Sequence, residues 1–379
     1  MLGINKLSFW EKELYFEDID YTIIGAGIVG YSTAISLREQ FPKAKILIIE
    51  RGYLPTGAST KNAGFACFGS PTEVLDDIQE NGEEAVIQLI NKRWKGLQLL
   101  LKRVGKSIID FQENGSYEIF TADEASTFLR VTQKIPYLNK LVEKAIGKRD
   151  AYSEIENSTF NFSSIAGIIK NKYEGQINTG LMVNELHKIA VQHDIKIIFG
   201  VTLKTWSDKK SNVQLNTTIG DFLTKRLIIA TNGLSKSILP KEDVTPARAQ
   251  VIVTKPLKKT PFEGTFHYDS GFYYFRNIGN RILLGGGRNL DILGETTTDM
   301  ENTILITDKL KSLLSEVILP NVSHEIDYSW SGIMGVGTTK APIVKKISEN
   351  VAIGIRLGGM GVALGSLVGE ELSLLIEEK

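Results

Sequence analysis

A glycine-rich turn near the N-terminus, Gly25-Ala26-Gly27-Ile28-Val29-Gly30, constrains the fold of this chain more than any other feature. Apolar residues predict a strand over Tyr21–Ile24 before the turn, a helix over Ile28–Gln40 after it and a second strand over Ile46–Ile49. At such a junction the first glycine permits the tight turn, the second lets the backbone approach a pyrophosphate, and the third lets helix and strand pack closely. The first N–H groups of the helix then face the phosphates. The turn therefore predicts a Rossmann-type βαβ unit that binds a dinucleotide.

The acidic residue Glu50 follows the second predicted strand, 20 residues after Gly30. A carboxylate at this place can accept both ribose hydroxyls of an adenosine and would repel a 2′-phosphate. NAD and FAD satisfy these residues equally well, but three further segments favour FAD. They are a small polar loop, a second glycine turn after a late apolar strand, and a glycine turn before the last predicted helix: Gly57–Gly64, Ala230–Gly233 and Gly358–Gly361. The dipole of that last helix could stabilise negative charge on a reduced flavin.

In this order, these segments resemble the D-amino-acid oxidase/glycine oxidase (DAO) family of FAD-dependent oxidoreductases. The resemblance spans nearly the whole chain and extends to Glu174–Asn178, Pro246–Gln250, Trp330–Gly332 and Gly358–Leu364. It implies an α/β fold, in which a Rossmann-type FAD-binding domain (GR2-like) carries an inserted antiparallel-sheet substrate domain. We expect residues 1–90, 165–245 and 325–379 to form the discontinuous FAD-binding domain, and residues 91–164 and 246–324 to form the substrate domain.

The resemblance also implies which residues hold FAD, without a covalent bond. Gly25, Ala26, Gly27, Ile28, Val29, Gly30, Glu50 and Arg51 would surround the ADP half, with Val201 beside the adenine. The residues that would border the phosphates and the isoalloxazine are Ser59, Thr60, Lys61, Asn62, Ala63, Gly64, Thr231, Asn232, Gly233, Arg356, Gly358, Gly359, Met360 and Gly361.

In this family a hydride passes from a substrate carbon to flavin N5, so the protein mainly positions and polarises the substrate. The expected substrate-side residues are Arg356, Arg276, Tyr274, Met334 and Lys61. Arginine offers a planar fork for a carboxylate, and tyrosine can add a hydrogen bond. Alternation along a strand places Tyr274 and Arg276 on one face and their neighbours Tyr273 and Phe275 on the other. Lys61 could instead be an exposed loop residue.

We expect the chain to oxidise a small amine or amino acid, to give an imine that hydrolyses, and to pass the electrons to oxygen or another acceptor. Ile333-Met334 stands where amino-acid oxidases often have a carboxylate-binding arginine, which weakens the case for an ordinary α-amino acid. One alternative is an FAD-dependent 2-hydroxy-acid or polyol dehydrogenase, disfavoured because no histidine base lies near the flavin motifs in the sequence. Another is a flavin-binding protein without turnover.

Composition restricts the partners. Lys plus Arg equal Asp plus Glu at 44 each, so no net charge draws the chain to nucleic acid. The most apolar long stretch, 351–376, is interrupted by charged residues, unlike a membrane span of ~20 apolar residues. The single cysteine, Cys67, reads as a small buried thiol, and the four histidines lack metal-ligand spacing. We expect a cytoplasmic protein with a small-molecule substrate, no metal, no nucleic acid and no membrane insertion.

Periodicity predicts the remaining elements. A long amphipathic helix spans 86–108, and two helices, Ala122–Gln133 and Tyr137–Ile146, are separated at Pro136. Consecutive strand candidates between 250 and 285 predict an antiparallel sheet, and 298–315 predicts a helix.

Overall fold

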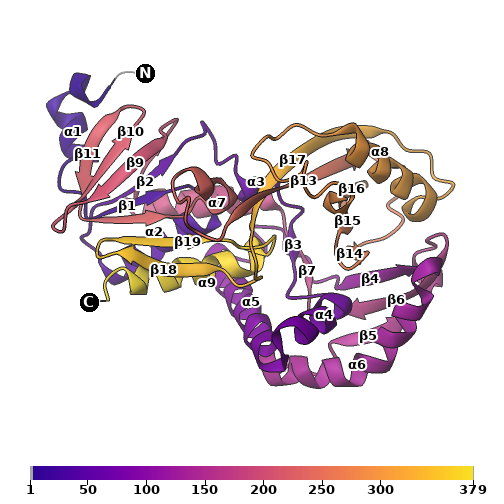
Figure 1. The fold of residues 1–379 in the computed structure, drawn as a ribbon. Coiled ribbons are helices and arrows are strands. Elements are labelled where there is room, and N and C mark those ends of the chain that lie inside the picture. Colours follow the sequence, from indigo (N-terminus) through magenta and orange to yellow (C-terminus); the bar gives the residue numbers. More distant parts are fainter. Residues whose placement is uncertain (1–2, 379) are drawn as a thin grey trace.

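Two large sheets organise the chain, whose residues 3–378 are described by a computed structural model (Figure 1). The first sheet has the order β18-β19-β12-β1-β2-β8, and all neighbours are parallel except β18, which runs antiparallel to β19. Its strands are β1 (Tyr21–Ile24), β2 (Ile46–Glu50), β8 (Lys196–Phe199), β12 (Arg226–Ile229), β18 (Ile343–Ser348) and β19 (Val351–Ile355). The parallel part, with β1 at the point where the order reverses, is a Rossmann-type sheet.

The six-stranded sheet is covered on both faces, which explains why its central strands are continuous apolar runs. Ile23 faces a core formed with helices, whereas its neighbour Ile24 faces a core formed with a small sheet. The helices are α2 (Ile28–Gln40), α5 (Glu83–Val104), α7 (Thr179–Gln192) and α9 (Gly361–Leu375). The small antiparallel sheet comprises β9 (Leu203–Asp208), β10 (Val213–Thr217) and β11 (Gly220–Thr224).

The second large sheet has eight strands in the order β17-β13-β16-β15-β14-β4-β6-β5. Its pairs are antiparallel apart from the parallel pair of β14 and β4. The strands are β4 (Ser116–Thr121), β5 (Tyr152–Ile155), β6 (Ile165–Asn171), β13 (Thr245–Thr254), β14 (Thr265–Tyr268), β15 (Tyr273–Ile278), β16 (Arg281–Gly286) and β17 (Ile326–Val336).

The two faces of the eight-stranded sheet differ in what covers them. One face carries an aromatic core in which the rings of Phe266 and Phe275 stack 4.7 Å apart and α8 (Ile304–Leu313) closes the surface, followed by a π-helical turn, Leu314–Ile318. The other face is covered at its β4–β5 end by α4 (Pro71–Asn81) and α6 (Ala125–Ile146). The β13–β15 part of that face is turned towards the six-stranded lobe and carries the candidate site.

Short elements connect the two lobes in Figure 1. They are α3 (Ala58–Lys61), β3 (Phe65–Ala66), β7 (Gly175–Gln176) and the 3-10 helix η4 (Asn232–Ser237). β3 and β7 pair antiparallel between the large sheets. The helix α1 (Phe9–Tyr15) lies at the outer edge of the six-stranded lobe, and its N-terminus is closed by a capping box of Ser8 and Glu11.

The structure confirms the predicted α/β fold class and the first βαβ unit, in which α2 has the predicted bounds. Two helix predictions are wrong. α6 continues through Pro136, because this proline lies on the exposed side of the helix, where the unbonded carbonyl one turn earlier can bond water. The helix expected over 298–315 begins only at Ile304, after an extended segment that Gln250 holds through a hydrogen bond from the N–H of Thr303 at 2.8 Å.

Strand pairing places β6 and β17 in the eight-stranded sheet, although we assigned 165–245 and 325–379 to the FAD-binding domain. The domain boundaries stay a prediction, since sheet membership alone does not define a domain. Among residues 3–378, no helix combines the length and apolarity needed to cross a bilayer.

Candidate functional site

The turn between β1 and α2 has the geometry that its glycines predict. Gly25 adopts a φ of +106°, and a Cβ at Gly30 would lie 1.8 Å from the carbonyl oxygen of Gly25, which no side chain could tolerate. The N-cap residue of α2 is Gly27, which has no side chain that could cap the helix. The N–H of Ile28 donates to the hydroxyl of Ser59 at 3.0 Å, so a polar side chain from another segment already meets this positive helix end. The turn and the serine fit a bound phosphate group.

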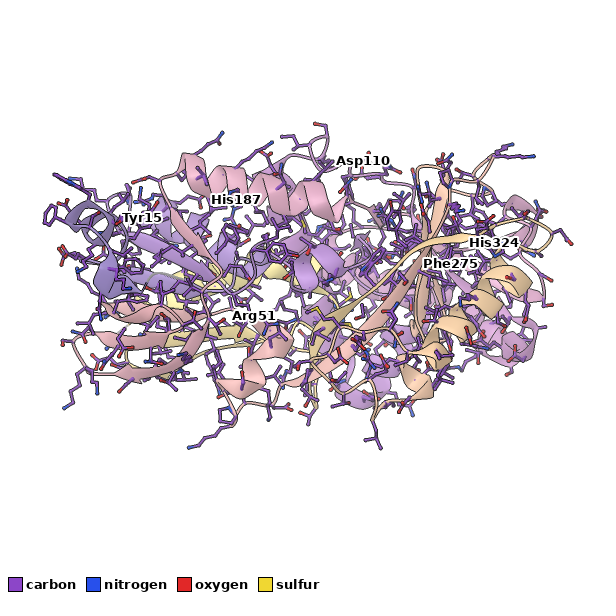
Figure 2. All side chains as sticks on the ribbon, turned by 90° about the horizontal axis from the view of Figure 1, so that it is seen from above. Tyr15, Arg51, Asp110, His187, Phe275 and His324 are labelled. Atoms are coloured by element: carbon purple, nitrogen blue, oxygen red, sulfur yellow. The ribbon has the colours of Figure 1, made fainter. Side chains whose placement is uncertain are left out.

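Glu50 is held against the same turn. One carboxylate oxygen accepts from the N–H of Ala26 at 3.0 Å, and the other accepts from the N–H of Gly52 at 2.9 Å. Each oxygen keeps a lone pair that a ribose hydroxyl could use. The buried Val201 donates its N–H to the carbonyl of Glu50 at 3.0 Å, whereas Arg51, labelled in Figure 2, is exposed.

The polar loop after Gly57 is shaped by Asn62. The amide of Asn62 donates to the carbonyls of Ala58 and Ser59 at 3.1 and 2.8 Å, and its oxygen accepts from the N–H of Gly64 at 2.8 Å. Thr60 donates its hydroxyl to a carbonyl earlier in the loop. These bonds fix the backbone that brings Ser59 to the start of α2.

Two further glycine turns converge on β17. The side-chain oxygen of Asn232 accepts from the N–H of Leu357 at 3.1 Å, which joins the turn after β12 to the turn after β19. A Cβ at Gly233 would lie 2.1 Å from the carbonyl oxygen of Met334, and a Cβ at Gly359 would lie 3.3 Å from the Met334 sulfur. Met334 therefore lies against both turns, and its role beside the substrate or flavin stays a prediction.

The helix α9 begins at Gly361 without a side-chain cap on its N-terminus. Gly358 and Gly359 before it have φ values of +55° and +84°, which favour glycine, and a Cβ at Gly361 would meet no atom within 4 Å. Thr231 is turned towards the protein, because its hydroxyl lies 2.8 Å from that of Ser235. The N-terminal ends of α2 and α9, neither of which is capped by its own N-cap residue, fit the two electron-rich parts of FAD, its diphosphate and its pyrimidine ring.

Arg356 is fully engaged by the protein. Its Nε donates to the carbonyl of Ala341 at 3.0 Å, one Nη donates to the hydroxyl of Thr339 at 2.8 Å, and the other forms an ion pair with Asp243. The residue has a φ of +63° and is 9% exposed. A contact with substrate or flavin would require these bonds to break, so that role of Arg356 stays a prediction.

Arg276 has a different environment. It is 6% exposed, and its Nη1 donates to the backbone carbonyls of Ile177 and Gly64 at 2.8 and 3.2 Å. Its Nε is buried without a partner, and among the described residues no carboxylate forms an ion pair with it. Burial lowers the pKa of the guanidinium to about 10, and the only opposing charge that raises it is Asp110. A buried guanidinium of this kind favours an anionic ligand.

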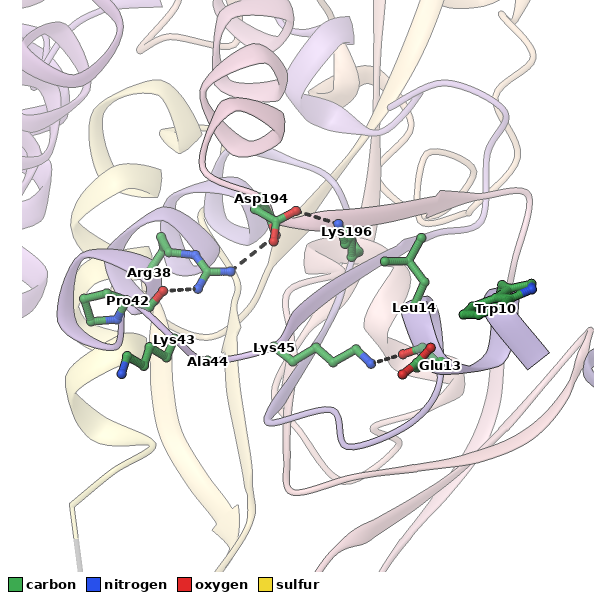
Figure 3. Close-up of a pocket in the computed structure, with 10 residues that line it drawn as sticks. All are labelled: Trp10, Glu13, Leu14, Arg38, Pro42, Lys43, Ala44, Lys45, Asp194 and Lys196. Atoms are coloured by element: carbon green, nitrogen blue, oxygen red, sulfur yellow. Dashed lines mark hydrogen bonds and ion pairs between the residues drawn. The ribbon is translucent and has the colours of Figure 1, made fainter. Parts of the chain in front are cut away.

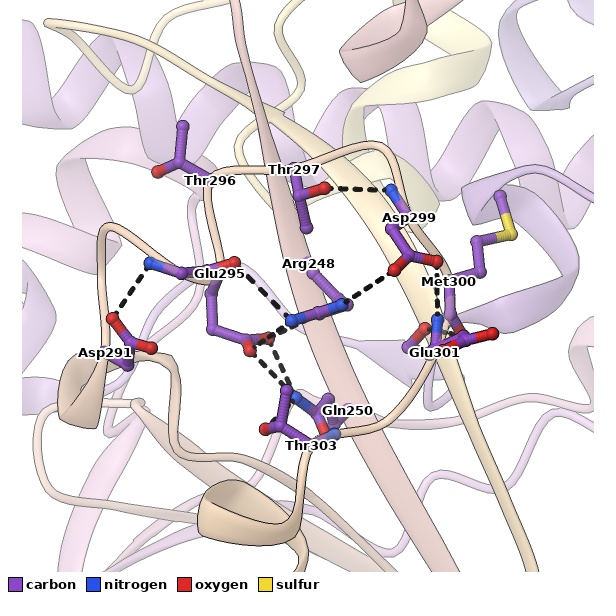
Figure 4. Close-up of polar contacts among 12 residues, drawn as sticks. Arg248, Gln250, Asp291, Glu295, Thr296, Thr297, Asp299, Met300, Glu301 and Thr303 are labelled. Atoms are coloured by element: carbon purple, nitrogen blue, oxygen red, sulfur yellow. Dashed lines mark hydrogen bonds and ion pairs between the residues drawn. The ribbon is translucent and has the colours of Figure 1, made fainter.

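A second buried arginine on the same sheet shows the contrast (Figure 4). Arg248 on β13 binds Glu295 through two nitrogens, at 2.7 and 2.9 Å, and Gln250 donates to the same carboxylate at 2.9 Å. Arg248 is therefore neutralised within the protein and holds the 291–303 loop, whereas Arg276 keeps its charge uncompensated.

Tyr274 lies on the same face as Arg276, and the predicted alternation is confirmed because Tyr273 and Phe275 belong to the aromatic core. The ring of Tyr274 stands edge-on to that of Phe65 at 5.7 Å and covers Gly285, where a Cβ would lie 2.6 Å from the ring. Burial raises the pKa of Tyr274 to about 12, so its hydroxyl stays a donor at neutral pH.

Lys61, the last residue of α3, is half-buried where α3 packs on β17. Its carbonyl accepts from the indole N–H of Trp330 at 2.9 Å, and a Cβ at Gly332 would lie 2.9 Å from its own Cβ. Ala63 packs beside Trp330. These contacts join the polar loop to the sheet face and leave the role of the ammonium group a prediction.

Sequence reasoning missed a polar cluster behind Phe65. A ring nitrogen of His267, the Cys67 sulfur and a carboxylate oxygen of Glu174 lie within 4.8 Å of one another. The His267 ring is edge-on to Phe65 at 5.1 Å, and its Nε2 is buried without a partner. The cluster joins residues about a hundred positions apart, so no spacing in the sequence indicates it. No histidine lies near the flavin motifs in the sequence, as stated above, but folding brings His267 to Phe65, next to the flavin loop. The expected absence of a metal stays a prediction.

The carboxylate of Glu174 is fully buried and accepts three hydrogen bonds. The N–H groups of Phe68 and Gly69 donate to one oxygen at 2.6 and 3.0 Å, and the hydroxyl of Ser116 donates to the other. Burial outweighs these bonds and raises the pKa of Glu174 to about 7.

Glu118 lies opposite His267 in the parallel pair of β4 and β14. Its carboxylate accepts from the N–H of Thr72 at 3.0 Å and from the Ser70 hydroxyl at 3.2 Å, and burial raises its pKa to about 8. Burial also lowers the pKa of His267 to about 4, so the imidazole is neutral at physiological pH.

A surface groove of about 690 Å³ lies elsewhere, between α1 and the C-terminal end of α2 (Figure 3). It is lined by Trp10, Lys45 and Asp194, among others. Because it adjoins the end of α2 that is opposite to the glycine turn, it takes no part in the candidate site.

A family model described as "FAD dependent oxidoreductase" (DAO) matches residues 20–375. The chain is 21% identical over 372 residues to the "Probable oxidoreductase OrdL" of Haemophilus influenzae, with 93% of this chain and 81% of that protein covered. Among solved structures, it is similar to L-proline dehydrogenase from P. horikoshii, with 17% identity, a TM-score of 0.74 and coverage of 95% and 94% of the two chains. Glycine oxidase from Geobacillus kaustophilus is 19% identical, with a TM-score of 0.73 and 95% of both chains covered.

Proposed function

The chain belongs to the DAO family of FAD-dependent oxidoreductases, and on that premise we propose that it oxidises the C–N bond of a small amine or amino acid. The substrate carbon would give up a hydride to the bound flavin, and the imine that remains would hydrolyse. FAD, when bound, supplies the two-electron acceptor. The protein binds the substrate, orients the carbon and keeps water away from the reacting atoms.

The uncompensated charge of Arg276 carries this proposal. The guanidinium lies against Gly64, at the end of the predicted flavin loop, and within residues 3–378 no carboxylate forms an ion pair with it. A substrate carboxylate would form a charge-assisted bond there, in place of the arginine that the sequence lacks at Met334. L-proline dehydrogenase and glycine oxidase are named for amino acids, which supports the same substrate class.

The remaining residues of the face have matching roles in the proposal. Tyr274 donates a hydrogen bond from its hydroxyl, Phe65 and Trp330 exclude water, and Met334 and Lys61 border the flavin. The residues proposed to hold FAD are those of the glycine turns together with Glu50 and Ser59, whose polar atoms lie at the start of α2. Arg356 contributes by fixing the loop beside the last glycine turn. Oxygen or another acceptor then removes the electrons.

Anaerobic bleaching of the flavin tests the proposal. The purified holoprotein is mixed with a panel of amines, N-methyl amino acids, α-amino acids and 2-hydroxy acids, and the flavin absorbance is followed. We expect an amine or amino acid to reduce the flavin, with carboxylated members effective at lower concentration. A full panel without bleaching would contradict the proposal.

Oxidation of a 2-hydroxy acid is the second candidate, because His267 offers an unpartnered ring nitrogen close to Phe65. A neutral imidazole can accept the hydroxyl proton while hydride leaves the carbon. Selective bleaching by 2-hydroxy acids in the same panel would favour this candidate.

A further inference from the structure

The imidazole of His267 has a buried, unpartnered ring nitrogen on the face of the sheet that also carries Tyr274 and Arg276. It pairs across strands with Tyr274, and both rings stand edge-on to Phe65, at 5.1 and 5.7 Å. Phe65 directly follows Gly64, whose carbonyl accepts a hydrogen bond from Arg276. Thus His267, Tyr274 and Arg276 share one face, and the only one of them with a buried acceptor atom left free is His267.

An unpartnered buried nitrogen is costly, since the atom has lost water without gaining a protein donor. Above its pKa of about 7, Glu174 is ionised and offers the imidazole no proton donor, and Cys67 offers only a weak one. The group that best satisfies the nitrogen is therefore an external N–H or O–H donor, which a substrate bound to Arg276 would carry.

The charged and titratable groups around His267 come from every element that packs against it. The negative charge of Glu73 raises the pKa of His267. Glu73 itself stays ionised, because the charges of Arg93 and Lys340 lower its pKa to about 2. The other groups of the cluster are Cys67 and Glu174, and Glu118 lies opposite His267 on β4. Farther out, Asp77 pairs with Lys340, and the charges of Glu174 and Glu118 act on Tyr152. Of these, Glu174 is the carboxyl within 4.8 Å of His267.

We propose that His267 accepts the hydrogen bond and then the proton of the substrate's amino group, and that Glu174 is a positioning residue that stabilises the protonated imidazole. The assignment rests on the proposed function. In the step, hydride leaves the substrate carbon for the flavin, the C–N bond becomes double, and the N–H proton passes to His267. The substrate is oxidised by two electrons, the flavin is reduced by two, and the imidazole carries the proton until solvent removes it.

Three isosteric carboxylates that lack an α-hydrogen test the contact without turnover. They are 2-aminoisobutyrate, 2-hydroxyisobutyrate and pivalate, which differ only in an amino, hydroxyl or methyl group. Their affinities for the holoprotein are measured from the change in flavin absorbance. We expect His267→Phe, which keeps the ring packing on Phe65, to lower the affinity ratio of 2-aminoisobutyrate to pivalate about tenfold. An exposed histidine at the end of α7 gives the control, since His193→Phe should leave the ratio unchanged.

If the protein instead binds 2-hydroxyisobutyrate more tightly than 2-aminoisobutyrate and loses that preference in His267→Phe, the assignment of an amine as the donor to His267 is overturned. A ratio that is unchanged in His267→Phe would overturn the contact, while bleaching by amines would leave the proposed function intact. If none of the three acids binds, the proposal of a carboxylate site at Arg276 is wrong. The protonation state of the His267 imidazole then decides whether His267 can still accept a proton.

Nitrogen NMR of the histidine-labelled holoprotein reads that state directly. Among the four histidines, the signal lost in His267→Phe should show a proton on Nδ1, a free Nε2 and no titration between pH 5.5 and 8.5. A protonated Nε2, or a midpoint near the ordinary histidine value, would overturn the proposal. In Glu174→Gln, the rate of flavin reduction should lose its rise with pH near 7, whereas a merely structural glutamate would leave the pH profile in place.

Discussion

Three arginines are similarly buried but have different roles. They are Arg248, Arg276 and Arg356, at 5, 6 and 9% exposure. Glu295 neutralises Arg248 and Asp243 pairs with Arg356, so both hold loops in place. Within the described part of the chain, Arg276 donates hydrogen bonds to backbone carbonyls alone. At the scale of single residues, the partner of a charge, more than its burial, separates a structural arginine from a ligand-binding one.

The buried Glu118 makes the stability of the protein depend on pH. Its folded pKa of about 8 lies above the ordinary value of 4.5, so its stabilising contribution is complete below pH 4.5 and is lost as pH rises through 8. We expect the free energy of unfolding to fall over this window, by on the order of a few kcal/mol from this residue. In Glu118→Gln the fall should be smaller. Urea denaturation at pH 5, 6.5 and 8, with saturating FAD, measures it, and equal pH dependence in both proteins would refute the assignment.

At the scale of elements, the turn between β1 and α2 depends on the absence of one side chain. In Gly30→Ala the new Cβ would lie 1.8 Å from the carbonyl oxygen of Gly25, so β1 and α2 must separate. We expect a loss of about 1–3 kcal/mol in unfolding free energy and poor retention of FAD. Gly57→Ala is the matched control, because its Cβ meets nothing within 4 Å and its φ is −77°. Thermal unfolding and the flavin-to-protein absorbance ratio compare the two; similar behaviour would show that close packing at Gly30 is unimportant.

Elements whose determinants are local could be predicted from the sequence. The glycines, the apolar strand and Phe41-Pro42 define α2, and Ile353 with its neighbours defines β19. The break expected at Pro136 failed, because tertiary packing of α6 on β4–β6 outweighs the loss of one exposed hydrogen bond. The start of α8 also depends on a distant residue, Gln250.

At the scale of the whole molecule, a network of ion pairs connects the loop between β17 and β18 to α4, which covers the eight-stranded sheet, and through α4 to α5, which covers the six-stranded sheet. Lys340 binds Asp77 on α4 at 2.6 Å and Glu73 at 3.2 Å, and Glu73 also binds Arg93 on α5 at 3.1 Å. Asp77 is 3% exposed, so removing its partner leaves a buried carboxyl unpaired.

Lys340→Met should therefore loosen the loop. We expect a loss of about 1–2 kcal/mol in stability, since Lys340 is partly exposed, and faster hydrogen exchange over 337–342. Because this loop adjoins Gly358, FAD should also dissociate faster. Lys345→Met, which removes a surface pair with Glu242, serves as the control. Hydrogen exchange that is unchanged at 337–342 would mean that the network of ion pairs does not hold the loop.

The whole site could be predicted only in part. Its cofactor side follows from glycine turns, which have a recognisable form in the sequence. Its substrate side is built by convergence of residues 67, 174, 267 and 276, and neither the free nitrogen of His267 nor the missing counter-charge of Arg276 can be seen before the strands are paired.

Carboxylate recognition by Arg276 is the central claim, and one measurement tests it most directly. The rate of anaerobic flavin reduction is compared for the amino acid that bleaches the flavin best and for its neutral carboxamide, in the wild type and in Arg276→Gln. The account predicts that the wild type prefers the carboxylate at least tenfold in kcat/KM and that the variant, with FAD still bound, loses this preference. An equal preference in both proteins would contradict it.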